Sequence, residues 1–177
     1  MNRTASLERL LKSLQQSEYA GDSVLLSIHI DKSDNQQETI DVATSFVFEH
    51  GKIEVVQNDA EAGLAEAWFG AWRPSSAHEK AIIFEDDIIL SPHWYQWLKA
   101  ACSSIEDRQD VAGISLQRQQ LIPFQPHRQE EIVNNNIPFL FPLVGSIGFS
   151  PNPAVWSSFL AWLESIELKT YDVTTPG

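Results

Sequence analysis

Cysteine is almost absent from this chain of 177 residues, since Cys102 is the only one. A single cysteine excludes an internal disulfide framework and a zinc site made of cysteines alone. Basic residues are also scarce: 12 Lys and Arg stand against 24 Asp and Glu, which gives a net charge of −12. This charge repels nucleic acid and anionic lipid. A phosphate-bearing ligand stays compatible with it if a metal ion supplies positive charge.

Long apolar runs and the common nucleotide and hydrolase motifs are missing as well. No stretch of 18 apolar residues predicts a membrane-spanning helix. Residues 1–16 show a helical apolar pattern without the continuous apolar stretch of a signal peptide. The chain has no P-loop, no GxSxG and no GxGxxG, and its five histidines lack metal-ligand spacing. Ser/His/Asp catalysis therefore has no local support.

What the chain does contain is the composition of a globular domain, with 43% hydrophobic residues, six Trp and nine Phe. Apolar periodicity and turn residues predict alternating elements. Helices are expected at 1–16, around 40–50 with a stop at Gly51, at 60–72, from Ser91-Pro92 onward and at 151–164. Strands are expected at 24–30, 53–57, within 81–90, at 111–116 and at 143–149, with a long polar loop at 117–136. This alternation predicts an α/β fold with a mostly parallel sheet and helices on both faces.

The acidic triplet Glu85-Asp86-Asp87 is the most informative feature. It follows an apolar strand segment, and ligands of open α/β sheets bind at the carboxyl ends of the strands. Three adjacent carboxylates favour neutralisation by a cation, and their hard oxygens suit Mg²⁺ or Mn²⁺. The alternative is a solvated acidic turn.

Asp31 ends the buried strand expected at 24–30, a neighbour of the strand before the triplet, and lies at the same edge if the sheet is parallel. Its carboxylate is suited to accept a hydrogen bond from a base N–H or a ribose hydroxyl. A turn or cap residue is the alternative interpretation. A calcium loop starting here is rejected, because its sixth position is Gln36 instead of glycine and its twelfth is Val42 instead of glutamate.

Several segments together resemble GT-A-fold glycosyltransferases, in particular the N-acetylglucosaminyltransferase I type and its family-two-like relatives. They are the Asn-Arg start before a helix, SIHIDKSDN, NDAEAGLAEAWFGAW, AIIFEDDIILSPHWYQWL and LVGSIGFSPNPAVW. The apolar-EDD-apolar-Ser-Pro segment is the most specific part. The resemblance implies a GT-A-like (Rossmann-like) fold and a metal-dependent, inverting transfer of sugar from a nucleotide sugar, a UDP-sugar, to a glycan, protein or small-molecule acceptor hydroxyl.

The resemblance also implies roles for individual residues. Glu85 and Asp86 belong to the family's variant of the DxD motif, with Asp86 toward the ribose or the metal shell. Asp87 would hold Mn²⁺ or Mg²⁺, and Asp31 would contact the uracil. Arg3 matches a basic position near the nucleotide.

The catalytic base is assigned to Asp172, which lies downstream of the metal motif at an interval similar to the family's; Glu164 and Glu167 are rivals. The base would take the proton of the acceptor hydroxyl while the metal stabilises the departing diphosphate. A Golgi lumen or the cytoplasm is compatible with the resemblance.

The resemblance also predicts that residues 1–177 form a single glycosyltransferase-like domain that is incomplete at both ends. The family's first strand, interior in the sheet, has no counterpart before the first helix, and the acceptor-side segments have none after Gly177. We therefore expect marginal stability, which an added upstream strand of about six residues should improve. The alternative function is a truncated, non-catalytic nucleotide-binding or interaction domain with the same fold.

Overall fold

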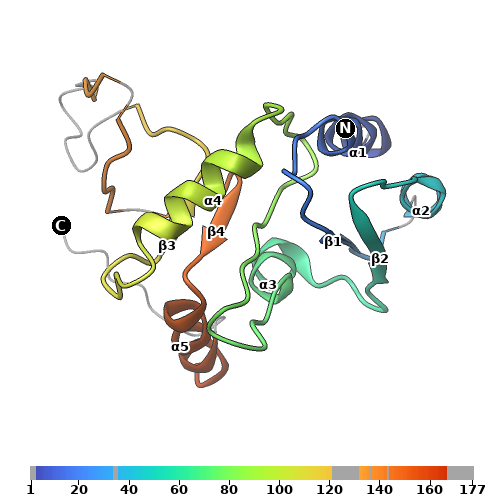
Figure 1. Cartoon of the computed structure of the whole chain (residues 1–177). Coiled ribbons are helices and arrows are strands. Elements are labelled where there is room, and N and C mark those ends of the chain that lie inside the picture. The colour runs from blue at the N-terminus through green and yellow to red at the C-terminus, as the bar shows by residue number, and fades with distance from the viewer. Residues whose placement is uncertain (1–2, 34–35, 121–131, 136, 143, 167–177) are drawn as a thin grey trace.

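The structure is a computed structural model that describes residues 3–33, 36–120, 132–135, 137–142 and 144–166. Its elements follow one another along the chain as drawn in Figure 1. They are α1 (Arg3–Gln15), β1 (Val24–Ile30), α2 (Gln36–Ser45), β2 (Gly51–Gln57), α3 (Gly63–Gly70), α4 (Trp94–Ser104), β3 (Gly113–Ser115), β4 (Phe149–Pro151) and α5 (Pro153–Glu164). The predicted mixed α/β class is confirmed.

The two longest strands, β1 and β2, form a parallel pair with α2 as the crossover between them. Their register runs from Val24 opposite Gly51 to Ile30 opposite Gln57. Gly51 was predicted to stop a helix, but α2 ends at Ser45 and Gly51 opens β2. A Cβ atom at Gly51 would lie 1.8 Å from the carbonyl oxygen of Val24, so the close approach of the two strands requires glycine there.

The second sheet corrects the expectation of a mostly parallel arrangement. β3 and β4 pair antiparallel, and Ile83 joins Phe149 through one further antiparallel bridge. The strand expected within 81–90 is therefore reduced to that bridge, because the chain turns at Asp86 and Asp87. The strand expected at 143–149 is likewise shifted to Phe149–Pro151, directly after the left-handed Gly148. Among the described residues, β1–β2 and β3–β4 stay separate sheets.

The main core lies between α1, the β1–β2 pair and the start of α4. The apolar stripe of α1 is buried as its spacing predicts, with Leu11 only 2% exposed. Ile28 and Ile30 of β1 pack in the same core, whereas Leu25 and His29 are exposed. Side chains alternate between the faces of a strand, so this sheet has one covered and one exposed face within the described part, instead of helices on both. Figure 1 shows α1 and α2 on the same side of the pair.

A second, aromatic core joins α3, β4 and α5. Phe149 and Trp156 are buried there, and Trp68 stacks on Phe149 with 5.8 Å between ring centroids. The predicted final helix begins at Pro153, capped by Asn152, whose side chain accepts a hydrogen bond from Ala154 N. The helix expected from Ser91-Pro92 begins later, at Trp94, because a turn closed by the Trp94 N–H and the Ser91 carbonyl precedes it.

Candidate functional site

The acidic turn at Glu85-Asp86-Asp87 lies between two apolar segments that hold it in place. Ile82 and Phe84 before it, and Ile88 and Leu90 after it, pack against the main core. Within the turn, Glu85 and Asp86 are partly buried and Asp87 is exposed. The three carboxylates therefore differ in their access to solvent.

Asp86 is paired with a residue from the start of the chain. Arg3, the first residue of α1, donates from Nη1 to Asp86 Oδ1 at 2.7 Å. The Arg3 side chain is 71% exposed and that of Asp86 is 27% exposed. An ion pair this open to water adds little stability. The ion pair is informative about position, because it joins the N-terminus of α1 to the acidic turn across 83 residues of sequence.

Asp31 lies directly after β1 and binds the loop that leads into α3. Its Oδ1 accepts hydrogen bonds from Lys32 N, Asn58 Nδ2 and Ala62 N, and its Oδ2 accepts one from Gly63 N at 3.2 Å. These hydrogen bonds lower the pKa of the Asp31 carboxyl, because they stabilise its charged form. The largest contribution comes from the backbone N–H of Ala62, and the next from the side-chain amide of Asn58. This bonding is that of the turn or cap residue considered above. A nucleotide contact by Asp31 stays a prediction.

The donor chemistry at the acidic turn is compatible with a divalent cation. Mg²⁺ is usually bound by one or two carboxylates together with substrate phosphates and water, and it does not need a closed protein cage. Asp87 offers an exposed carboxylate of this kind, with Glu85 two residues away. In the part of the chain that the structure describes, no three His, Cys, Asp or Glu side chains are grouped to hold a metal ion. A metal ion at the turn stays a prediction.

The three candidates for the catalytic base lie at or beyond the end of α5. Asp172 and Glu167 are outside the described residues. Glu164 is exposed and accepts a hydrogen bond from Arg73 Nη1 at 2.7 Å. Glu164 is thus an exposed carboxylate engaged in a surface ion pair. The assignment to Asp172 stays a prediction.

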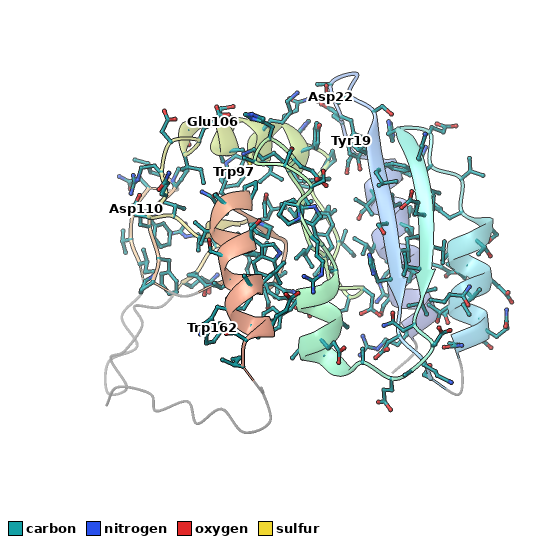
Figure 2. The ribbon with its side chains drawn as sticks, turned by 90° about the horizontal axis from the view of Figure 1, so that it is seen from below. Tyr19, Asp22, Trp97, Glu106, Asp110 and Trp162 are labelled. Atoms are coloured by element: carbon teal, nitrogen blue, oxygen red, sulfur yellow. The ribbon has the colours of Figure 1, made fainter. Side chains whose placement is uncertain are left out.

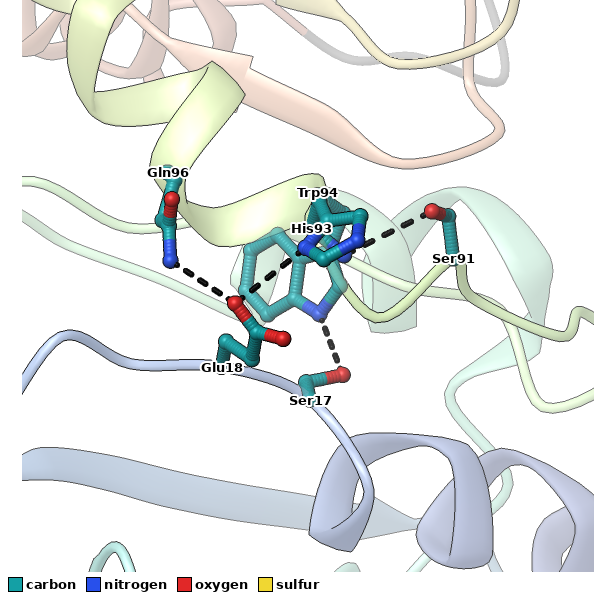
Figure 3. Close-up of polar contacts among 6 residues, drawn as sticks. All are labelled: Ser17, Glu18, Ser91, His93, Trp94 and Gln96. Carbon is teal, nitrogen blue, oxygen red and sulfur yellow. Dashed lines mark hydrogen bonds and ion pairs between the residues drawn. The ribbon is translucent and has the colours of Figure 1, made fainter.

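A polar cluster between α1 and α4 was missed in the sequence. Trp94 Nε1 donates to Ser17 Oγ at 2.9 Å, and Glu18 Oε2 contacts His93 Nδ1 and Gln96 Nε2 (Figure 3). Ser17 and Trp94 are both buried. No local sequence motif could have predicted these contacts, because the residues that form each of them are more than 70 positions apart. The cluster fixes the C-terminal end of α1, whose other end carries Arg3.

An open basin lies away from the predicted site. It has a volume of about 840 Å³ and is lined by residues 17–23, residues 49–52 and Gln96. Tyr19 and Asp22 mark its position at the start of β1 in Figure 2. Asp31 follows the opposite end of that strand. There, Asp22 Oδ2 accepts hydrogen bonds from Tyr95 Oη and Lys99 Nζ. These bonds lower the pKa of the Asp22 carboxyl, with the bond from Lys99 as the largest cause.

Comparison with known proteins identifies the family. The family described as the SPBC1E8.03c C-terminal domain matches residues 5–135, and the chain belongs to this family. The matched span includes Asp31 and the acidic turn, but neither Arg3 nor Asp172. No curated protein and no solved structure matches the chain. No helix among the described residues is both long and apolar enough to cross a membrane.

Proposed function

We propose that this chain is a GT-A-type glycosyltransferase domain that uses a divalent metal ion and a UDP-sugar. The observation that carries the proposal is the 2.7 Å contact between Arg3 and Asp86. The sequence resemblance assigns both residues to the nucleotide-sugar site, although they are 83 positions apart. Their proximity supports that assignment, because a shared site requires α1 and the acidic turn to meet.

Each residue of the site has a distinct part in the proposed reaction. Asp87, exposed at the turn, would hold Mn²⁺ or Mg²⁺ with help from Glu85. The bound ion would supply positive charge to the diphosphate leaving group. Arg3 has an exposed guanidinium that can reach phosphate oxygens, and Asp86 orients it. Asp31 Oδ2 accepts one hydrogen bond in the structure, which leaves a lone pair for uracil or ribose.

Proton transfer completes the proposed reaction. The acceptor hydroxyl attacks the anomeric carbon, the bond from that carbon to the diphosphate oxygen breaks, and the nucleoside diphosphate leaves. Asp172 would take the hydroxyl proton as general base. One attack from the face opposite the leaving group inverts the anomeric centre. The transfer is thus a single displacement with inversion.

Thermal unfolding with added ligands tests the donor site. Mn²⁺ and UDP together should raise the melting temperature more than either alone, because a ligand that binds only the folded state stabilises it. Asp87→Asn should abolish the metal-dependent part of this shift. Asp107→Asn is the matched control, since Asp107 is an exposed acid after α4 and its loss should leave the shift intact. A metal-dependent shift that survives in Asp87→Asn would rule out the assignment.

The second candidate is a non-catalytic domain that binds a nucleotide or a partner. Asp31 favours it, because four hydrogen bonds to its carboxylate already give that residue a structural part. The separation of β1–β2 from β3–β4 also favours it, since the expected sheet is continuous. Turnover of a radiolabelled UDP-sugar separates the two candidates: hydrolysis or transfer supports the enzyme, and UDP binding without turnover supports the second.

A further inference from the structure

The segment between β3 and β4 exposes an unusual number of apolar side chains. We call its exposed members the apolar loop; they are Val133 (87% exposed), Ile137 (64%), Phe139 (38%), Leu140 (67%) and Val144 (58%). In Figure 1 the described parts of this segment run as an extended trace outside the packed helices and strands. Apolar groups gathered in this way on a surface usually mark a contact site.

Both ends of the apolar loop are fixed by contacts to the rest of the protein. Arg118 Nη2 donates to the Ile132 carbonyl at 2.8 Å and to Asn134 Oδ1 at 3.0 Å. At the other end Gly145 is buried, and a Cβ there would lie 2.5 Å from Ser115 Oγ of β3. The exposed apolar side chains therefore belong to a segment whose two ends are held against the rest of the protein.

Charge is absent from this part of an otherwise acidic chain. From Ile132 to Leu163 the sequence contains no Asp, Glu, Lys, Arg or His, although the whole chain carries −12. The loop itself supplies no basic residue to recruit anionic lipid, the guanidinium of Arg118 at its base is bonded to Ile132 and Asn134, and the net charge of the chain opposes such recruitment. The electrically matching partner is a neutral surface.

The backbone of the loop also suits partial removal from water. Pro138 and Pro142 flank the Phe139–Phe141 pair, whose rings lie 6.2 Å apart. Prolines lack the N–H group, so this stretch has fewer donors to desolvate than ordinary chain. The described residues of the loop form neither a strand nor a helix, which are the surfaces that protein partners commonly extend or cover.

We propose that the apolar loop inserts into the interfacial region of an electrically neutral, zwitterionic lipid surface of the phosphatidylcholine type. Exposed aromatic and aliphatic side chains bind such interfaces through the apolar area they bury, without spanning the bilayer. This inference is independent of the proposed sugar transfer, because none of the loop residues belongs to the donor site.

Co-sedimentation of the full chain with phosphatidylcholine vesicles tests the proposal. The parent should bind, and vesicles with about one third phosphatidylserine should bind it less, because of the net charge. The double variant Ile137→Asp, Leu140→Asp should weaken binding about tenfold or more, since it removes two apolar side chains and adds two charges. Val47→Asp is the matched control: Val47 is 73% exposed between α2 and β2, and its loss should leave binding unchanged.

Three outcomes would overturn the proposal. The first is a parent that does not bind phosphatidylcholine vesicles. The second is equal binding by the parent and the double variant, with circular dichroism confirming that both are folded. The third is a dimer in size-exclusion chromatography that the double variant converts to a monomer, since a second copy of the chain would then cover the loop.

Discussion

Removing the hydroxyl of Ser17 should destabilise the protein out of proportion to the size of the change. Ser17 is 4% exposed and Trp94 is 8% exposed, and the indole N–H donates to Ser17 Oγ at 2.9 Å. In Ser17→Ala the indole N–H stays buried without an acceptor, which costs about 1–3 kcal/mol. For a chain of this size, each kcal/mol lowers the melting temperature by about 2–4 °C, so we expect a loss of about 2–12 °C.

Urea unfolding followed by tryptophan fluorescence measures this loss. Ser103→Ala is the matched control: Ser103 lies on α4, is exposed, and donates to the Lys99 carbonyl, so its loss should cost less than about 0.5 kcal/mol. In a double-mutant cycle, Trp94→Phe should cost less in the Ser17→Ala background than in the parent. A Ser17→Ala variant as stable as the control, or a cycle without coupling, would refute the reasoning.

Three further predictions concern the site and the ionisable groups. Asp31→Ala should weaken UDP binding in calorimetry while leaving the affinity for Mn²⁺ alone nearly unchanged; equal UDP affinity of variant and parent would contradict the nucleotide contact. Asp172→Asn should lower turnover by about 10²-fold or more without weakening donor binding. If Glu164→Gln shows that loss instead, the base is misassigned. Burial raises the pKa of Tyr19 and Tyr95 from about 10 to about 12, so the folded state keeps protons that the unfolded state loses. The free energy of unfolding should therefore fall from pH 10 to 12, and urea midpoints that stay constant over this range would contradict the shift.

Elements with strong periodicity were predictable from the sequence, and long-range pairing was not. The leucines at positions 7, 10, 11 and 14 have the spacing of one face of a helix, and this spacing predicts α1. The prediction succeeds because these four side chains are also the ones that the core buries. The mostly apolar, Val- and Ile-containing segment at 24–30 likewise predicts β1. The partners of β4 could not be predicted, because short strands of three residues take their orientation from tertiary contacts with Ile83 and β3.

The candidate site follows the same division. Residue type and position after an expected strand mark Asp31 and the acidic turn as candidates, although the strand before the turn is reduced to the bridge at Ile83. The sequence could not show that Ala62 and Gly63 would donate to Asp31, because these donors are backbone groups and leave no pattern in side chains. Nor could it show that Arg3 would meet Asp86, since that contact depends on how α1 docks.

The way α1 is held has a consequence during synthesis of the chain. Arg3 contacts Asp86, Ser13 accepts a hydrogen bond from Leu90 N, and Ser17 binds Trp94, so each contact spans 77 to 83 residues. A ribosome adds about 5–20 residues per second, so α1 waits roughly 4–17 s for these partners after it is made. During that interval the leucine stripe of α1 can pack only on the parts of the core already made, β1, α2 and β2, and slower translation before residue 94 would prolong this incompletely covered state.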